Sequence, residues 1–233
     1  MLGRNKEIGI IVFSRYNSTR FPGKALVKIE GRELLGHVID RAKKIGNEFK
    51  IVVATSLHED DDKIEKFAIS EKVDVYRGSQ NNVMNRAIEC CKKFNFNGFA
   101  RICGDRPLFC PNIARELILF HIKHSIQLTT NVKKKTYPRG FTFEVVNVDS
   151  LIKVEQESLL KDDLEHITNY FYRNSQDFKV YNFESPIKGI SDLSFTVDYP
   201  EDIEKISKII RSHKCDPVDL TLGQIIKSVK EYL

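Results

Sequence analysis

The sequence IGIIVF at residues 8–13 runs directly into SRYNSTRFPGK at residues 14–24, and this junction determines the predicted fold. The first six residues are apolar throughout, as in a strand buried on both faces of a parallel sheet. The next eleven residues carry three cations, serine hydroxyls and a glycine. Open α/β folds bind ligands at the carboxyl ends of their strands, where Arg and Lys can bind phosphate oxygens. The junction therefore predicts an α/β fold with a loop that holds a polyanion, most simply a triphosphate.

Short apolar runs alternate with amphipathic stretches through the first half of the chain. The apolar runs predict strands at residues 8–13, 51–54, 73–76, 98–102 and 126–130. The amphipathic stretches predict helices at residues 34–45, 61–70, 83–94 and 113–124. Because this alternation is typical of βαβ units, we expect a three-layer α/β fold with a mostly parallel, Rossmann-like sheet covered on both faces.

The pattern changes after residue 130. The alternating residues 141–146 predict an antiparallel ribbon, and helical patterns recur near residue 151 and at residues 164–172. Further strands are expected at residues 178–183 and 193–197, before a mostly helical tail at residues 201–233 with a break near residues 215–217. We expect one domain over residues 1–233, with residues 131–185 as a small excursion over the open edge of the sheet.

The composition is that of a globular chain: 233 residues, 41% of them hydrophobic, with a formal net charge of +5. This mild charge argues against a dedicated nucleic-acid binder and fits a pocket for small anions equally well. The N-terminus is polar, and the apolar run after it is too short for a signal peptide or a membrane span, so we expect a cytoplasmic protein without a membrane partner. The five cysteines have no Cys-x-x-Cys spacing, which argues against disulfides and zinc.

Two carboxylates follow predicted strands. Asp105 lies in RICGDRPL at residues 101–108, and Asp198 lies in LSFTVDYPED at residues 193–202. Because Mg²⁺ on a triphosphate needs only one or two protein carboxylates, Asp105 and Asp198 are the predicted metal ligands. Glu201 and Asp202 fall in the first turn of the next helix, where they favour its dipole. Taken alone, each motif is also compatible with an ordinary turn.

Three other features are better explained without special chemistry. The acidic run at residues 59–62 falls at a predicted helix start, where negative charge is favoured. His121 and His124 lie one turn apart on a predicted helix, but without a third ligand nearby a solvated helix face is the simpler interpretation. Cys103 ends an apolar strand, which favours packing over reactivity.

The basic loop is neither a Walker A loop nor a Gly-x-Gly-x-x-Gly loop. Its pattern Arg-x-x-Ser-x-Arg-x-Pro-x-Lys, with the later Gly-Asp-x-Pro-Leu and Thr-Val-Asp-x-Pro-Glu-Asp, resembles the cytidylyltransferases that activate sugars and sugar acids. The likeness is closest to the spore coat polysaccharide biosynthesis protein F type and covers residues 10–202. Arg106 and Cys103 depart from it, since they stand where the family more usually has a Cys and a Thr.

This resemblance implies a fold of the nucleotide-diphospho-sugar transferase type, CTP as co-substrate and Mg²⁺ as cofactor. It assigns catalytic roles to Arg15, Lys24, Asp105 and Asp198. It also implies CTP contacts from residues 53–56 and 76–86. Residues 54–56 taken alone could be a strand end and a helix cap. In the second segment, Asn85 replaces the family's Asp. The implied CTP-binding residues are Ser14, Arg15, Ser18, Arg20, Lys24, Thr55, Ser56, Ser79 and Arg86.

The acceptor side is implied by YPRGFTFE at residues 137–144 and EHIT at residues 165–168, which resemble motifs of the same family. Thr142 stands where the family more often has Asp. In an alternative interpretation, Arg139 pairs with Glu144 or Glu165 and His166 packs at a dimer contact. The implied acceptor-binding residues are Tyr137, Arg139, Glu144 and His166.

We therefore expect a homodimeric transferase that joins CMP to an anionic sugar, sugar acid or sugar phosphate in surface polysaccharide synthesis, with its dimer contact in residues 131–185. One alternative is a glycosyltransferase that consumes a nucleotide sugar, for which Asp60-Asp61-Asp62 formally supply an Asp-x-Asp motif. Another is a non-catalytic module that binds nucleotide or nucleic acid. Such a module would not need the carboxylates at residues 105 and 198.

Overall fold

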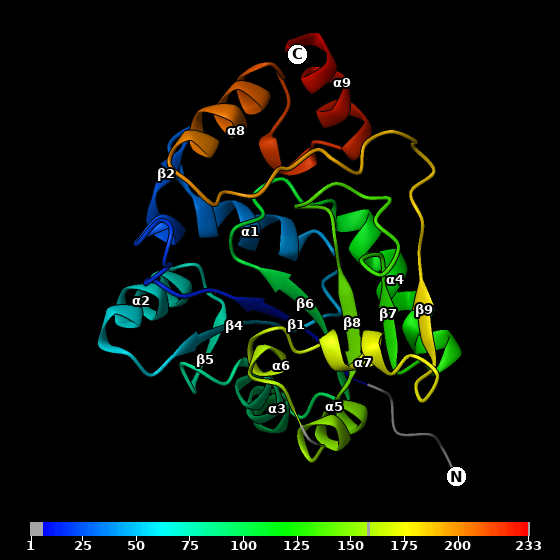
Figure 1. Cartoon of the computed structure of the whole chain (residues 1–233). Coiled ribbons are helices and arrows are strands. Elements are labelled where there is room, and N and C mark those ends of the chain that lie inside the picture. Colours follow the sequence, from blue (N-terminus) through cyan, green and yellow to red (C-terminus); the bar gives the residue numbers. More distant parts are fainter. Residues whose placement is uncertain (1–6, 158, 233) are drawn as a thin grey trace.

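A seven-stranded sheet lies at the centre of the computed structural model, which describes residues 7–157 and 159–232 (Figure 1). The strand order is β5 (Asp74–Gly78), β4 (Ile51–Ser56), β1 (Ile8–Phe13), β6 (Gly98–Cys103), β8 (Glu144–Asn147), β7 (Leu128–Thr130) and β9 (Val180–Asn182). The first four strands are parallel, whereas β8 is antiparallel to both of its neighbours. A separate antiparallel ribbon joins β2 (Lys28–Ile29) to β3 (Arg32–Glu33).

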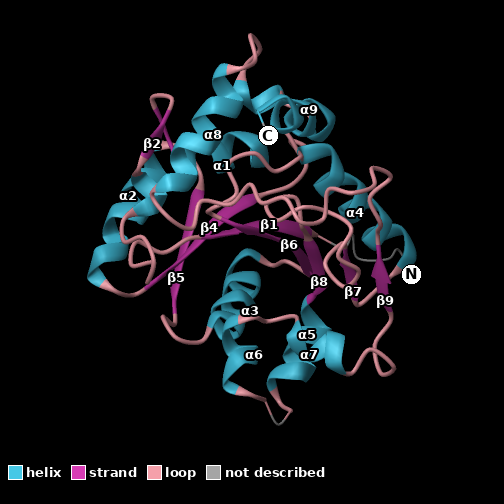
Figure 2. Ribbon diagram, turned by 45° about the horizontal axis from the view of Figure 1, so that its top comes forward, coloured by secondary structure: helices cyan, strands magenta, loops and turns pink. Residues whose placement is uncertain are grey.

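Helices cover both faces of this sheet (Figure 2). One face carries α1 (Leu34–Lys43), α2 (Asp62–Ser70) and α4 (Pro111–His124). The other face carries α3 (Val83–Phe94), α5 (Val148–Glu155), α6 (Lys161–Glu165) and α7 (Asn169–Arg173). Beyond α1, the C-terminal helices α8 (Glu201–Arg211) and α9 (Leu222–Tyr232) form a third apolar cluster. Three short 3₁₀ turns complete the fold: η1 (Lys24–Leu26), η2 (Glu59–Asp61) and η3 (Pro217–Asp219).

The continuous apolar sequence of β1 follows from its burial on both sides. Ile10 and Val12 contribute to the cluster beneath α1, and Ile11 and Phe13 contribute to the cluster beneath α3. Successive side chains of a strand point to opposite faces, so an internal strand needs apolar residues at every position. The predicted three-layer α/β fold is therefore confirmed, and none of the described helices is long and apolar enough to cross a bilayer.

Two predicted elements are wrong in detail. Residues 193–197 form no strand of the sheet, because their backbone groups bond to the loop at Arg139 and to Asp105, with one isolated bridge between Arg139 and Ser194. The helix predicted over residues 164–172 is two short helices, α6 and α7. They are separated because His166 leaves the helical conformation and the Thr168 hydroxyl turns to the buried Glu144.

The segment at residues 131–185 is more deeply built into the sheet than expected. It does not only cover the open edge, because its strand β8 is inserted between β6 and β7. Antiparallel pairing with both neighbours buries β8, which explains why Val145 and Val146 are inaccessible to solvent.

The direction in which the chain builds the sheet reverses beside β1. After β1 the chain adds β4 and β5 on one side, then crosses over to add β6 on the other. The loops that follow β1 and β6 therefore leave the sheet edge in different directions. Such a reversal opens a crevice at the carboxyl ends of the strands, where α/β folds bind ligands.

Candidate active site

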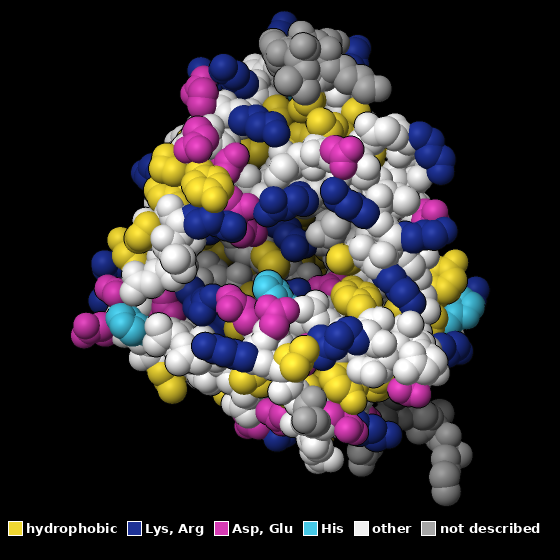
Figure 3. All heavy atoms as spheres, viewed as in Figure 1, with side chains coloured by type: hydrophobic (Ala, Val, Ile, Leu, Met, Phe, Trp, Pro, Cys, Tyr) yellow, Lys and Arg dark blue, Asp and Glu magenta, His cyan; other side chains and the backbone are white. Residues whose placement is uncertain are grey.

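A cavity of about 690 Å³ opens at this crevice. Figure 3 shows it as a hollow near the middle of one face, with Lys and Arg side chains gathered around it. The loop after β1 and the turn after β6 supply much of its lining. The predicted site residues that line it are Ser14, Arg15, Ser18, Arg20, Lys24, Arg86, Asp105 and His166. The lining residues that we did not predict include Asn17, Thr19, Gln80, Arg101, Cys103 and Glu165.

The basic loop after β1 is closed on itself. The carbonyl of Tyr16 accepts hydrogen bonds from the backbone of Ser18 at 3.0 Å and of Gly23 at 2.7 Å. Gly23 has a φ of 76°, in the left-handed region that costs glycine nothing, and it lies against the Tyr16 ring. This closure turns the chain back into η1, so that Lys24 re-enters the site at the start of a helical turn.

Lys24 links the two predicted metal ligands. Its ammonium nitrogen lies 3.1 Å from Oδ2 of Asp105 and 3.5 Å from Oδ1 of Asp198, and it donates to the carbonyl of Val197 at 2.6 Å. The backbone of Val197 donates in turn to the carbonyl of Asp105 at 2.9 Å. Two carboxylates that are far apart in the sequence therefore lie together at one cation.

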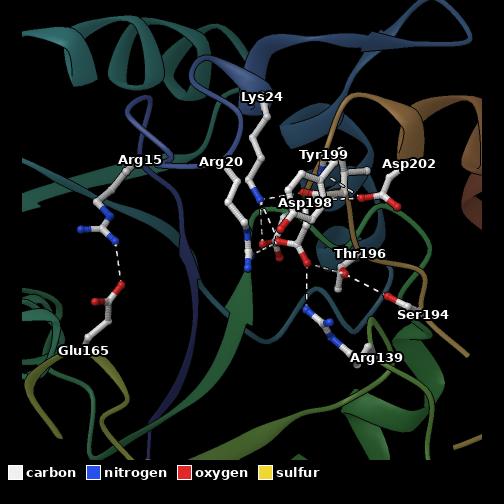
Figure 4. A network of polar contacts seen from close by, with 12 residues as sticks. Arg15, Arg20, Lys24, Arg139, Glu165, Ser194, Thr196, Asp198, Tyr199 and Asp202 are labelled. Carbon is white, nitrogen blue, oxygen red and sulfur yellow. Dashed lines mark hydrogen bonds and ion pairs between the residues drawn. The ribbon is translucent and has the colours of Figure 1, made fainter. Parts of the chain in front are cut away.

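Asp198 is the most heavily contacted acid of the site. Arg20, Lys24 and Arg139 converge on it, with Arg139 at 2.8 Å, and the Thr196 hydroxyl donates to it at 3.1 Å (Figure 4). Burial would raise the pKa of Asp198, but Lys24, the hydroxyl and the two guanidinium groups outweigh burial and lower that pKa. The carboxylate is thus held in its charged form.

Asp202 fixes the turn that presents Asp198. Its carboxylate accepts the backbone N–H groups of Asp198 at 2.8 Å and of Tyr199 at 2.9 Å. From the first turn of α8, where its charge favours the helix dipole, Asp202 also holds the backbone of two residues that lead into that helix.

Arg15 lies on the other side of the cavity from Asp198. It donates to Glu165 of α6 at 3.0 Å and to the carbonyl of Gln80 at 3.2 Å. The neighbouring His166 is exposed and lies 3.7 Å from Asp162. These contacts place α6, which comes late in the sequence, at the mouth of the cavity beside the first loop.

Arg86 is a buried cation in the cavity lining. It donates to the carbonyl of Ser79 at 2.6 Å, and its guanidinium lies over the Phe13 ring. Burial lowers the pKa of Arg86 to about 10, so it remains charged at neutral pH. The Ser79 hydroxyl accepts from the backbone of Asn82, the residue whose side chain caps the start of α3. A buried cation of this kind is suited to an anionic or carbonyl-bearing ligand.

Thr55 and Ser56 are buried at the end of β4 and are absent from the cavity lining. The Ser56 backbone donates to Asp61 at 2.9 Å, and its hydroxyl contacts the same carboxylate. Their predicted contact with a nucleotide base stays a prediction.

The predicted acceptor residues divide into two groups. Tyr137 is buried in the apolar cluster with Phe141 and Phe195, and Glu144 is buried beneath the site. Glu144 accepts from Arg101 at 2.7 Å, from Thr168 at 2.5 Å and from Tyr172 at 2.6 Å. Arg139 and His166 remain accessible.

Charge pairing in this region differs from the alternative considered above. Arg139 pairs with Asp198 and not with Glu144 or Glu165, which are occupied by Arg101 and Arg15.

The solvated face expected for His121 is wrong, because this side chain is buried and hydrogen-bonded to the Thr129 hydroxyl at 3.0 Å. No cluster of three or more potential metal-ligating side chains occurs among the described residues. Cys103 is a free, half-buried thiol.

The chain matches the family model described as "Cytidylyltransferase" over residues 9–224. It is 28% identical over 226 residues to the spore coat polysaccharide biosynthesis protein SpsF of Bacillus subtilis, covering 94% of this chain and 92% of that protein. It is 30% identical over 223 residues to an uncharacterised protein of Methanocaldococcus jannaschii, covering 95% and 89% of the two chains.

Solved structures agree with these matches. A cytidylyltransferase from Leptospira borgpetersenii superposes with a TM-score of 0.91 at 27% identity, covering 97% of this chain and 94% of that one. A CMP:2-keto-3-deoxy-manno-octonic acid synthetase solved with CTP shares the fold, with a TM-score of 0.68 at 17% identity and coverage of 88% and 99%. The protein is a nucleotidyltransferase that belongs to the cytidylyltransferase family, whose members use CTP.

Proposed function

We propose that this enzyme transfers CMP from CTP to a small anionic acceptor, namely a sugar, sugar acid or sugar phosphate, and releases pyrophosphate. One observation carries the proposal. Lys24 joins Asp105 and Asp198 at the edge of a cavity that is lined by Arg15, Arg20 and Arg86. Phosphoryl transfer depends mainly on positioning and on charges placed where the phosphate charge develops, and this arrangement supplies both.

Mg²⁺ fits the donor chemistry of this site. Asp105 and Asp198 offer hard oxygen ligands, and the Lys24 ammonium lies between them as a cation that both carboxylates attract. Mg²⁺ in such sites takes one or two protein carboxylates and completes its shell with water and substrate phosphates. Bound by Asp105 and Asp198, Mg²⁺ would neutralise charge on the phosphate oxygens of CTP.

The residues of this chain have distinct roles in the proposed reaction. An acceptor oxygen forms a bond to the α-phosphorus of CTP as the bond from that phosphorus to the bridging oxygen of the β-phosphate breaks. The electron pair leaves with pyrophosphate, and Arg15, Arg20 and Lys24 stabilise its added charge. An acceptor phosphate is already ionised and needs no base. A hydroxyl acceptor would need a base, and Asp198 would be a weak one because the surrounding cations, against the effect of burial, lower its pKa.

Two predicted acceptor residues, Arg139 and His166, have exposed side chains. Arg139 has a side chain 61% exposed and bonded to Asp198, so it can turn to an incoming anion beside the reacting phosphate. His166 lines the cavity. A guanidinium suits a carboxylate or a phosphate through paired hydrogen bonds. The name of the Bacillus relative supports a role in surface polysaccharide precursor synthesis.

The test is pyrophosphate release with each of the four ribonucleoside triphosphates and Mg²⁺, against a panel of acidic sugars and sugar phosphates. We expect release with CTP and one acceptor class, and its loss in Asp105→Asn. The matched control is Asp192→Asn, since the Asp192 side chain is 93% exposed and pairs only with surface Lys135 among the described contacts. Release with another triphosphate in preference to CTP would overturn the proposed donor.

We propose that the enzyme is a homodimer with its contact in residues 131–185, as the resemblance implies. Sedimentation equilibrium of the purified chain tests the oligomeric state directly. A dimer whose cross-links map to residues 131–185 supports the proposal, and a monomer at assay concentrations contradicts it.

A further inference from the structure

Asp61 carries a buried carboxylate that is not part of the cavity lining. This carboxylate is bonded to Tyr16, near the start of the basic loop. Asp61 is 2% exposed, and its Oδ1 accepts the backbone N–H of Tyr16 at 2.6 Å. Its Oδ2 accepts the backbone N–H of Ser56 at 2.9 Å and contacts the Ser56 hydroxyl. Asp61 therefore ties the first residues after β1 to the end of the neighbouring strand β4.

A helix-capping role does not explain this carboxylate. Asp61 is the N-cap residue of α2, but its side chain makes no capping hydrogen bond there. The cap of η2 is His58, whose ring nitrogen accepts the backbone N–H of Asp60 at 3.2 Å. Burial would raise the pKa of Asp61, but the hydrogen bonds from Ser56 and Tyr16 outweigh burial and lower it. Among the described residues, the Asp61 carboxylate accepts hydrogen bonds only from neutral donors. Two of these donors are the backbone N–H groups of Tyr16 and Ser56.

Tyr16, which Asp61 holds, also makes the hydrogen bonds that close the loop. Tyr16 accepts the Gly23 backbone through its carbonyl at 2.7 Å, and the Lys63 ammonium lies 4.1 Å from the centre of its ring. The next residue, Asn17, donates to Asp60 at 2.7 Å. Fixing Tyr16 therefore fixes the closure that sets the positions of Arg15 on one side and Lys24 on the other.

We propose that Asp61 is a positioning residue for the nucleotide, which holds the loop at residues 14–24 in the shape that places Arg15, Arg20 and Lys24 around the triphosphate. The inference rests on the proposed use of this loop for CTP. It adds a residue that touches no substrate and lies in the run that formally resembled an Asp-x-Asp metal motif. Asp61 serves here through backbone hydrogen bonds, with both oxygens occupied.

The experiment compares Asp61→Asn with wild type under conditions where the wild-type reaction and CTP binding are already established, so that failure of the proposed function is recognised first. An amide in place of the carboxylate keeps one acceptor oxygen and sets an NH₂ group against a donor. Because a hydrogen bond to a charged group is worth roughly 10- to 100-fold in an equilibrium constant, we expect the KM for CTP to rise by about that factor. The KM for the acceptor should remain unchanged.

The matched control is Asp62→Asn, one residue along, whose carboxylate pairs with Arg77 and, among the described contacts, bonds to no residue of the loop. Loss of folded protein would lower the apparent kcat in proportion to the drop in folded fraction and leave the KM for CTP unchanged, and that pattern would overturn the proposal. If Asp61→Asn does not fold, Ser56→Ala decides, because it removes the hydroxyl that contacts Asp61 and that also accepts the backbone N–H of His58 at 3.2 Å. The readout is then the affinity for inorganic pyrophosphate, which has no base for Ser56 to contact. A weaker affinity at an unchanged melting temperature supports the positioning role, and an unchanged affinity contradicts it.

Discussion

The ammonium of Lys24 lies 3.1 Å from the carboxylate of Asp105, although the two residues are 81 positions apart. The loop after β1 and the turn after β6 deliver them to the same edge of the sheet, since β1 and β6 are adjacent parallel strands. Lys24 also reaches Asp198, so it is the only charge common to both carboxylates among the described ion pairs.

Lys24→Met should reduce pyrophosphate release by about 10²- to 10³-fold, the usual effect of removing a positioned charge from a transition state. The methionine keeps the length of the side chain and Asp198 retains Arg20 and Arg139, so we expect a folded variant with a lowered melting temperature. The measurement is kcat with saturating CTP and acceptor. Lys28→Met is the control, because Lys28 is exposed and pairs only loosely, at 3.8 Å, with Glu33. A decrease smaller than threefold would show that Lys24 does not act on the departing phosphates.

Arg101 and Glu144 form a buried ion pair beneath the cavity. Their side chains are 16% and 7% exposed, and Thr168 and Tyr172 complete the hydrogen bonding of the carboxylate. Glu144→Gln leaves the Arg101 charge without its partner, and we expect it to lower the free energy of unfolding at neutral pH by about 3–5 kcal/mol. Urea denaturation followed by circular dichroism measures the difference. Glu184→Gln, which breaks the exposed pair with Lys134, is the control and should leave the transition midpoint unchanged.

The same pair should make this stability difference depend on pH. Burial would raise the pKa of Glu144, but Arg101 and the hydroxyl donors outweigh burial and lower it from its ordinary value of 4.5. A carboxylate with a lowered folded-state pKa stabilises the fold above its unfolded pKa and loses that contribution as the pH falls through its folded pKa. The difference between wild type and Glu144→Gln should therefore be constant above about pH 5.5 and shrink below pH 4.5. A constant difference down to pH 3 would contradict the assigned direction.

The contact between Arg15 and Glu165 spans the cavity mouth at 3.0 Å. If Arg15 binds the triphosphate, CTP must compete with Glu165 for the same guanidinium. Glu165→Gln weakens that competitor, so we expect the Kd for CTP, measured by calorimetry without acceptor, to fall several-fold. Asp177→Asn is a suitable surface control, since it changes the net charge equally and lies outside the cavity lining. Equal effects of both variants would indicate a general charge effect, and a weaker affinity in Glu165→Gln would mean that Glu165 assists CTP binding.

The sequence predicted the parts of the site that depend on local pattern. An apolar strand followed by a basic loop, and an Asp ahead of a Pro, can be recognised within about ten residues. The strand is observed as β1, and the loop and Asp105 line the cavity. The pairing of charges was less predictable. Arg139 pairs with Asp198 and not with Glu144, and its backbone is bonded to residues 193 and 195 of the segment that leads to Asp198. The role of Asp61 was also hidden, since it depends on a neighbouring strand bringing the Tyr16 backbone within reach. Long-range contacts of this kind leave no periodic signal in the sequence.

Cys103 offers a direct test of where CTP binds. It ends β6 and lines the cavity beside Asp105, whereas Cys215 is exposed outside the cavity lining. Cys90, Cys91 and Cys110 are buried, and burial raises the pKa of Cys90 to about 12, so all three should resist alkylation in the native protein. Iodoacetamide should therefore modify Cys103 and Cys215 in the free enzyme.

Adding CTP and Mg²⁺ should slow alkylation of Cys103 several-fold, because the bound nucleotide covers the turn after β6. Cys215 should react at the same rate with and without CTP, which makes it an internal control within one mass-spectrometry experiment. Inorganic pyrophosphate serves as a second probe, since it can occupy the phosphate positions without the nucleoside. If calorimetry confirms CTP binding while the rate at Cys103 stays unchanged, CTP does not occupy this cavity. Protection by CTP that is lost in Lys24→Met would instead connect the basic loop to the bound nucleotide without any need for turnover.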